Sequence, residues 1–148
     1  MNLRNTPTPA PEKTVDVPVT VRFRDLDAMG HVNNATYFTY LEQARIGFRD
    51  QVLPEFSGRF EFFAVVAENH LIYRKPIFYE DKIIVRCFLS HIRGKSYRFN
   101  YILLNPETGE EKARGYSVMV GFNYKTGQVA PLDPAFMEPT RPYTALNT

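Results

Sequence analysis

The sequence contains no tryptophan, a single cysteine and no long apolar run. Because Cys87 is alone, no disulfide can form within the chain, and a reducing cytoplasm is the expected location. No uninterrupted apolar stretch approaches the roughly 18 residues of a membrane span. The first residues also lack the apolar segment of a secretory signal. We therefore expect a cytoplasmic protein without a membrane span.

The sequence also has little excess of positive over negative charge. Lys and Arg number 18 and Asp and Glu 16, so the formal net charge is +2, which argues against a nucleic-acid partner. What the chain does contain is 44% hydrophobic residues over 148 positions, enough for one domain with a substantial core. We expect a disordered leader at residues 1–13, where prolines stand among polar residues, a single domain at 14–140 and a tail at 141–148.

The first structural pattern is an alternation of apolar and polar residues from Val15 to Phe23, which predicts a strand with one buried face. Pro18 cannot donate a ladder hydrogen bond, so an edge position or a bulge is expected there. A helix of about 18 residues and about 27 Å should follow. Asn33 or Asn34 is the predicted N-cap, and Pro54 stands just past the end. Its apolar stripe consists of Phe38, Leu41, Ala44, Phe48 and Val52.

Four further strands are expected, at residues 62–73, 82–91, 97–103 and 116–124, with an interruption at 68–70, a loop at 52–60 and a helical turn at 133–137. Short connections imply antiparallel pairing. A five-stranded sheet and one apolar-faced helix have an obvious arrangement, in which the sheet wraps around the helix. The outer face and the edges of that sheet would need cover or a partner.

The segment between the first strand and the helix carries the chemistry. It reads DLDAMGHVNNATYFTYLEQAR from Asp25 to Arg45, and places two carboxylates, an imidazole and two amides just ahead of a helix N-terminus. Such a terminus has unpaired backbone N–H groups and about half a positive charge. A site that needs both a base and oxyanion donors could be assembled from this segment. Asp27 has the type and position for the first role, and the N–H of Asn34 for the second.

The string D-x-D-x-x-G-H-V-N-N-x-x-Y-x-x-Y-x-E-x-A-R resembles the hotdog-fold acyl-CoA thioesterases, specifically the 4-hydroxybenzoyl-CoA thioesterase-like family. The resemblance covers roughly Val15 to Asn123. It implies an α+β hotdog fold, with a five-stranded antiparallel sheet wrapped around one long central helix. It also implies hydrolysis of an acyl-CoA thioester to a free carboxylic acid and coenzyme A, and no cofactor is expected.

The resemblance also implies site residues. Asp27 matches the catalytic carboxylate, and the backbone N–H of Asn34 matches the donor that polarises the thioester carbonyl. His31 is expected to bind or polarise substrate, with a turn histidine satisfied by backbone groups as the alternative. Gly30 and Asn33 are expected to contact substrate. Phosphates of coenzyme A are expected to meet residues of a later hairpin, namely Arg93, Lys95 and Ser96.

Other polar residues are expected to be structural. Asp25 should be a structural carboxylate at the strand end, Glu42 and Arg45 should pair on the helix surface, and Cys87 should be an inert core thiol. The three histidines are scattered and no Cys/His spacing is present, so no metal site is expected.

Several alternatives stay open. Asp27 can attack directly or activate water. The HVNN string is closer to relatives that act on fatty acyl thioesters, including plant acyl-carrier-protein thioesterases. Met29, however, stands where those plant enzymes carry Asn. A non-catalytic acyl-thioester-binding hotdog protein is another possibility. One copy leaves a side of the helix N-terminus open, so a homodimer or homotetramer with sites at the subunit interface is expected, where Asp27 would face the 68–73 segment or the basic turn of another copy.

Overall fold

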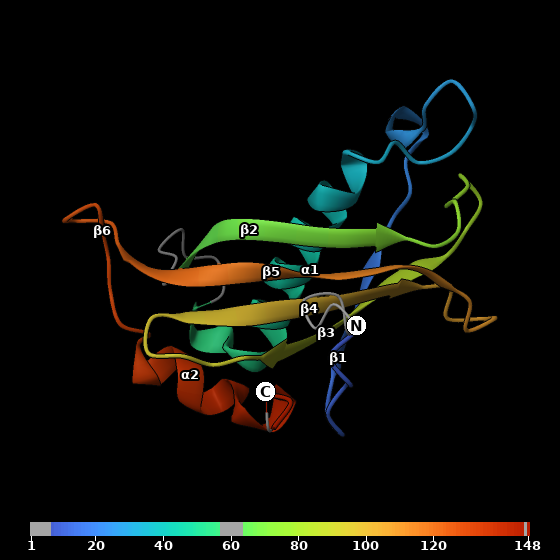
Figure 1. Ribbon diagram of the computed structural model, residues 1–148. Helices are drawn as coiled ribbons and strands as arrows, with labels where there is room; N and C mark the ends of the chain where they lie inside the picture. The colour runs from blue at the N-terminus through green and yellow to red at the C-terminus, as the bar shows by residue number, and fades with distance from the viewer. Residues whose placement is uncertain (1–6, 57–63, 147) are drawn as a thin grey trace, which may run out of the picture.

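The computed structural model describes residues 7–56, 64–146 and 148. One strand and the long helix come first, and the other strands and a short helix follow them along the chain (Figure 1). In chain order the elements are β1 (Val15–Val19), η2 (Phe23–Asp25), α1 (Thr36–Val52), η3 (Pro54–Phe56), β2 (Ala64–Tyr73), β3 (Ile83–Ser90), β4 (Ser96–Leu104), β5 (Glu111–Asn123), β6 (Gln128–Val129), α2 (Pro134–Thr140) and η4 (Arg141–Tyr143).

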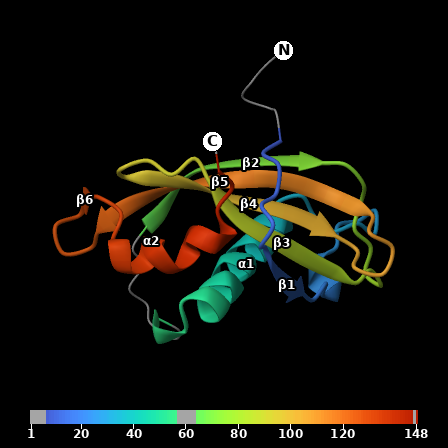
Figure 2. The same ribbon diagram turned by 90° about the horizontal axis from the view of Figure 1, so that it is seen from below.

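The main sheet has the strand order β1-β3-β4-β5-β2, and every neighbouring pair is antiparallel. The short β6 pairs with β5. The sheet arches over α1, which lies along its concave face (Figure 2). The predicted hotdog architecture is therefore confirmed, and Pro18 does lie on an edge strand, β1, where it pairs with Ile84 of β3.

The core forms where α1 meets the concave face of the sheet. The helix buries Tyr37, Tyr40, Leu41, Ala44 and Phe48. Gly47 allows the closest approach to β1, because a Cβ there would lie 2.5 Å from Cγ1 of Val17. The predicted stripe was wrong at Phe38, which is 39% exposed, since the two tyrosines occupy the side of the helix that faces the sheet.

Two predictions about the ends of elements were wrong. The first strand ends at Val19 and not at Phe23, because the chain turns into η2 and leaves the Phe23 side chain 78% exposed. The helix has Ala35 as its N-cap, without a side-chain cap. Oδ1 of Asn33 instead accepts a hydrogen bond from the N–H of Ala35 at 2.9 Å, which closes a turn just before the helix.

Strand β2 continues through the expected interruption at residues 68–70. The pairing of β2 with β5 shifts in register between Val66 and Glu68, which marks a bulge at the start of that segment. The predicted strand and loop residues at 57–63 lie outside the described residues. Strand β5 begins earlier than expected and α2 extends beyond the predicted helical turn. No helix among the described residues is long and apolar enough to cross a membrane.

Candidate active site

A tight turn at residues 27–31, here called the Asp27 turn, follows η2. The N–H of Asp27 donates to the carbonyl of His31 at 2.7 Å, and the N–H of Gly30 donates to the carbonyl of Asp27 at 3.0 Å. Gly30 has φ +80°, a conformation that favours glycine. Oδ1 of Asp27 accepts from the N–H groups of Met29 at 2.9 Å and His31 at 3.2 Å. The exposed Asp27 carboxylate is therefore held by the backbone of its own turn.

Asp25 ties this turn to the helix. Its carboxylate is buried, and Oδ2 accepts from the hydroxyl of Tyr40 at 2.7 Å and from the N–H of Arg22 at 2.9 Å. The N–H of Asn33 donates to the Asp25 carbonyl at 2.8 Å. Burial and the Asp25 hydrogen bond raise the pKa of the Tyr40 hydroxyl well above its ordinary value, so it remains a proton donor. These bonds agree with the structural role expected of Asp25.

The segment between β2 and β3 forms the other wall of the turn. His31 and Phe78 form an isolated antiparallel bridge, and their rings meet edge to face at 5.1 Å. The N–H of Val32 donates to the carbonyl of Ile77 at 2.9 Å. His31 is thus half-buried and packed in the turn, an environment compatible with either of its expected roles.

The start of α1 leaves a backbone donor available. Thr36 N–H donates to the Asn33 carbonyl, and Tyr73 of β2 donates its hydroxyl to the Asn34 carbonyl at 3.1 Å. Within the described part of the chain, the N–H of Asn34 has no acceptor. Asn34 is exposed, so this N–H can meet a ligand. The Tyr73 ring packs on Tyr37 at 4.9 Å and fixes this corner of the fold.

The predicted site residues fall into two groups. Asp27, Gly30, His31, Asn33 and Asn34 lie together at the N-terminal end of α1 (Figure 1). The second group lies in the β3–β4 turn at the opposite end of the sheet, because β3 begins beside the end of β1 and then runs away from it. That second group consists of Arg93, Lys95 and Ser96.

The predicted surface pair of Glu42 and Arg45 is not formed, since no ion pair within 4 Å joins these two described residues. Nη1 of Arg45 instead donates to the Tyr101 hydroxyl at 2.9 Å. That hydroxyl shares a hydrogen bond of 2.8 Å with Oγ of Ser117, which donates to Oδ1 of Asn69 at 2.6 Å. A chain of hydrogen bonds therefore crosses the concave face from α1 to β2.

A cavity of about 370 Å³ lies beside the second half of α1. Apolar and aromatic side chains dominate its lining, and the size falls within the range of small-molecule pockets. Its residues come from two helices and three strands that are far apart in the sequence, so the sequence pattern alone could only identify them as core residues. The lining includes Ile46, Phe48, Val65, Phe99, Met119 and Phe136, with Glu42, Arg45 and Arg49 among its charged residues.

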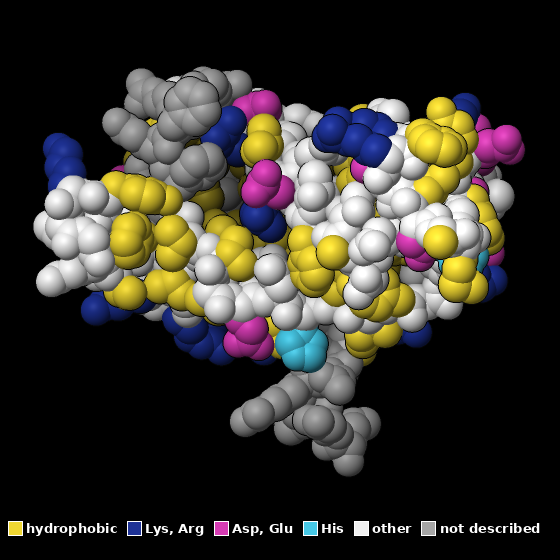
Figure 3. All heavy atoms as spheres, turned by 90° about the horizontal axis from the view of Figure 1, so that it is seen from above, with side chains coloured by type: hydrophobic (Ala, Val, Ile, Leu, Met, Phe, Trp, Pro, Cys, Tyr) yellow, Lys and Arg dark blue, Asp and Glu magenta, His cyan; other side chains and the backbone are white. Residues whose placement is uncertain are grey.

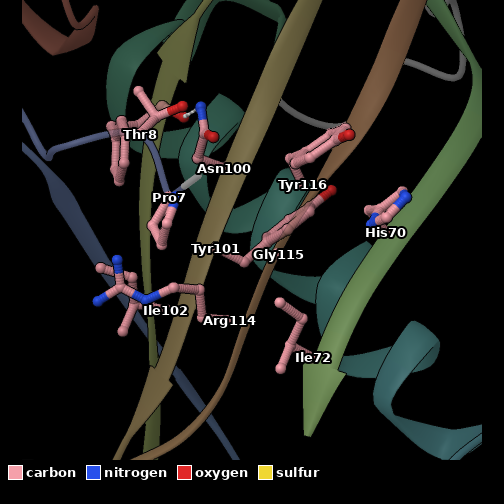
Figure 4. A pocket seen from close by; sticks show the side chains of 11 residues that line it. Pro7, Thr8, His70, Ile72, Asn100, Tyr101, Ile102, Arg114, Gly115 and Tyr116 are labelled. Carbon is pink, nitrogen blue, oxygen red and sulfur yellow. Dashed lines mark hydrogen bonds between the residues drawn. The ribbon is translucent and has the colours of Figure 1, made fainter. Parts of the chain in front are cut away.

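A smaller hollow of about 40 Å³ lies on the outer face of the sheet (Figure 4). The His70 ring stacks against Tyr116 at 5.1 Å, and the Arg98 guanidinium lies 4.1 Å from the centre of the Tyr116 ring. The hollow has room for only a few waters, and its described lining contains no carboxylate. It is therefore not a second candidate for the hydrolytic site.

Comparison with known proteins places this chain in a family. The model of the thioesterase-like superfamily matches residues 21–139. A Thermus thermophilus thioesterase, solved in complex with coenzyme A and Zn, is 35% identical, with a TM-score of 0.73 over 85% of this chain and 90% of that chain. The Escherichia coli long-chain acyl-CoA thioesterase FadM is 26% identical over 81% of this chain and 92% of its own length.

A Bacillus stearothermophilus structure described as a predicted thioesterase shares the fold. Its TM-score is 0.78 at 23% identity, over 89% of this chain and 97% of that one. The expected enzyme class, thioester hydrolase, is confirmed at the level of the family. The chain belongs to the thioesterase-like superfamily and has its hotdog fold.

Proposed function

We propose that the protein hydrolyses acyl-CoA thioesters at the Asp27 turn. The observation that carries the proposal is a carboxylate oriented by two backbone donors, on the same short segment as the Asn34 N–H, which has no acceptor among the described residues. The first group can act as nucleophile or general base, and the Asn34 N–H can stabilise the oxyanion. One such donor is worth about 10²–10³ in rate.

The two oxygens of Asp27 have different environments. Oδ1 accepts both turn hydrogen bonds, and Oδ2 accepts none from the described residues. Oδ2 is therefore the oxygen that would attack the thioester carbonyl or take a proton from water. Direct attack would form an anhydride and expel the thiolate of coenzyme A, and water would then release the acid. In the general-base route, water adds to the carbonyl and the thiolate leaves from the tetrahedral intermediate.

Coenzyme A as the carrier is supported by the relatives, one of which is named a long-chain acyl-CoA thioesterase and another of which was solved with coenzyme A. The 370 Å³ cavity along α1 offers an apolar environment for an acyl chain. Hydrolysis of acyl-carrier-protein thioesters and binding without hydrolysis are the two alternatives.

We also propose that the working site needs a second copy of the chain. β2 is an edge strand, and hydrophobic side chains gather along this side of the molecule (Figure 3). Among them Val66, Ile72 and Tyr73 are exposed. If two β2 edges pair about a two-fold axis, the β3–β4 turn of one copy lies at the same end as Asp27 of the other. Contacts from Arg93, Lys95 and Ser96 to phosphate then become geometrically possible.

The test is release of free thiol from a panel of acyl-CoA substrates of different chain length. Hydrolysis of at least one acyl-CoA supports the proposal. Tight binding without thiol release would identify a non-catalytic binder, and release from acyl carrier protein alone would identify the other carrier.

A further inference from the structure

Aromatic side chains next to the Asp27 turn remain in water. Phe23 of η2 is 78% exposed and Tyr79, between β2 and β3, is 51% exposed. Their rings meet edge to face at 6.2 Å. Aromatic side chains usually bury about 150–250 Å² each, so an exposed pair beside a candidate active site points to a surface that a ligand covers.

Arg24, the next residue after Phe23, has no carboxylate partner among the described residues. Arg24 follows Phe23 in η2 and is exposed, and no described carboxylate lies within 4 Å of its guanidinium. Three other cations near this end of the sheet have carboxylate partners, in the pairs Arg74–Glu111 at 2.6 Å, Lys75–Glu110 at 3.0 Å and Lys82–Glu107 at 2.9 Å. The Arg24 guanidinium is therefore available to bind an anion from outside the described chain.

We propose that Phe23, Arg24 and Tyr79, here called the Phe23 surface, bind the adenosine 3′-phosphate 5′-diphosphate end of coenzyme A. The inference rests on the proposed function. A base can stack on an exposed aromatic ring, and a guanidinium forms paired hydrogen bonds with phosphate. The nucleotide end of coenzyme A carries both groups, and its thioester end would lie at Asp27, four positions along the chain from Phe23.

Other occupants fit the same surface less completely. A lipid headgroup offers phosphate but no base for the rings. A second copy of the chain could cover the rings, but it would have to bring a carboxylate to Arg24. In the proposed dimer the β3–β4 turn of the second copy comes to this end of the sheet, where it would share the phosphates with Arg24, but the turn offers the base no phenyl or phenol ring.

Binding of adenosine 3′,5′-bisphosphate, followed by titration calorimetry, tests the surface without turnover. We expect the double variant Phe23→Ala/Arg24→Ala to bind at least about tenfold more weakly than the wild type, because one lost base stack is worth about that much. Lys125→Ala is the matched control, since it removes an exposed cation next to β6 at the other end of the sheet and should bind like the wild type.

A kinetic comparison then separates nucleotide binding from damage to the Asp27 turn. The double variant should have a higher KM for acyl-CoA, with an unchanged kcat and an unchanged KM for the same acyl group on pantetheine, which has no nucleotide. If catalytic efficiency falls equally on both substrates, the change disturbs the Asp27 turn. If KM and kcat change on neither substrate, the Phe23 surface does not bind the nucleotide. Both outcomes would overturn the inference.

The remaining outcomes are also decisive. If the protein hydrolyses no thioester but binds the bisphosphate through Phe23 and Arg24, the proposed function fails and the nucleotide site stands. If Arg93→Ala/Lys95→Ala loses bisphosphate binding while the Phe23 and Arg24 variant keeps it, the basic turn alone holds the nucleotide. If the wild type binds phosphatidylglycerol vesicles and not the bisphosphate, the surface is a lipid contact. Either of these last two results overturns the inference.

Discussion

The hydroxyl of Tyr40 donates a 2.7 Å hydrogen bond to the buried carboxylate of Asp25, 15 residues earlier in the chain. This bond joins the second turn of α1 to Asp25, which lies two positions before Asp27. Since the Asp25 carbonyl also accepts from Asn33 N–H, both sides of the turn depend on Asp25. The position of the candidate catalytic carboxylate is therefore set by a tyrosine that need not touch substrate.

Tyr40→Phe tests this dependence. Removal of the hydroxyl leaves a buried carboxylate oxygen with one donor fewer, so we expect the free energy of unfolding to fall by about 1–3 kcal/mol, measured by urea denaturation. Turnover should fall as well, because the Asp27 turn loosens. Tyr116→Phe, which removes the hydroxyl of a tyrosine on the outer face of the sheet, is the control and should change neither quantity. Wild-type turnover in Tyr40→Phe would contradict the positioning role.

Asp27→Asn tests the proposed chemistry. We expect the folded variant to bind substrate and to lose turnover by a factor on the order of 10³ or more, as for other removed catalytic groups. Asp25→Asn should mainly lower stability, because that side chain is buried and hydrogen-bonded to Tyr40 and Arg22. Thiol release and urea denaturation measure the two effects separately. Near-normal turnover in a folded Asp27→Asn protein would exclude Asp27 as the base or nucleophile.

His91 gives stability a pH dependence. Burial, followed by the nearby Arg98 and Arg93, lowers the pKa of His91 below its ordinary 6.5. The unfolded chain therefore takes up the proton first, and the free energy of unfolding should fall as the pH drops through about 6.5. His91→Gly should flatten this dependence, and it also suits the φ of +50°. Urea denaturation at pH 7.5 and 5.5 measures both proteins, and equal slopes in the two would contradict the assignment.

Mixed assembly tests the second copy. If Asp27 of one chain works with the basic turn of another, Asp27→Asn and Arg93→Ala/Lys95→Ala should complement each other after co-refolding. Half of the dimers would be mixed, each with one intact site, so recovery of roughly a quarter of wild-type activity at low substrate is expected for a two-fold dimer. Activity no higher than the mean of the two separate variants, or a fully active monomer by light scattering, would contradict the proposal.

The order of the elements was predictable because their patterns are local. Period-two alternation identified β1, and Leu41, Ala44 and Phe48 identified α1 within one residue of its length. The turn chemistry at Gly30 and the segment 25–34 could also be read directly, because the candidate catalytic groups lie within ten consecutive residues.

The wrong predictions arose where distant segments decide the outcome. Phe23 continues the apolar alternation but turns outward, because Asp25 closes η2 with a bond to Arg22 N–H. Arg45 donates a hydrogen bond to Tyr101 of β4 and forms no ion pair with Glu42 of its own helix. The separation of the Asp27 turn from the β3–β4 turn within one chain also follows from strand register, which no local pattern contains, and the phosphate contacts expected of the β3–β4 turn stay a prediction.

The strand order has a consequence for how the protein folds. β3, β4 and β5 are joined by short turns and pair with their sequence neighbours, whereas Val15 of β1 must find Cys87 of β3 across the helix and β2. Closing so long a loop costs entropy before its contacts form, so we expect β1 to join the sheet late. The Asp27 turn lies between β1 and α1, and a partly folded chain that already contains the β3–β5 meander would still lack the candidate hydrolytic site.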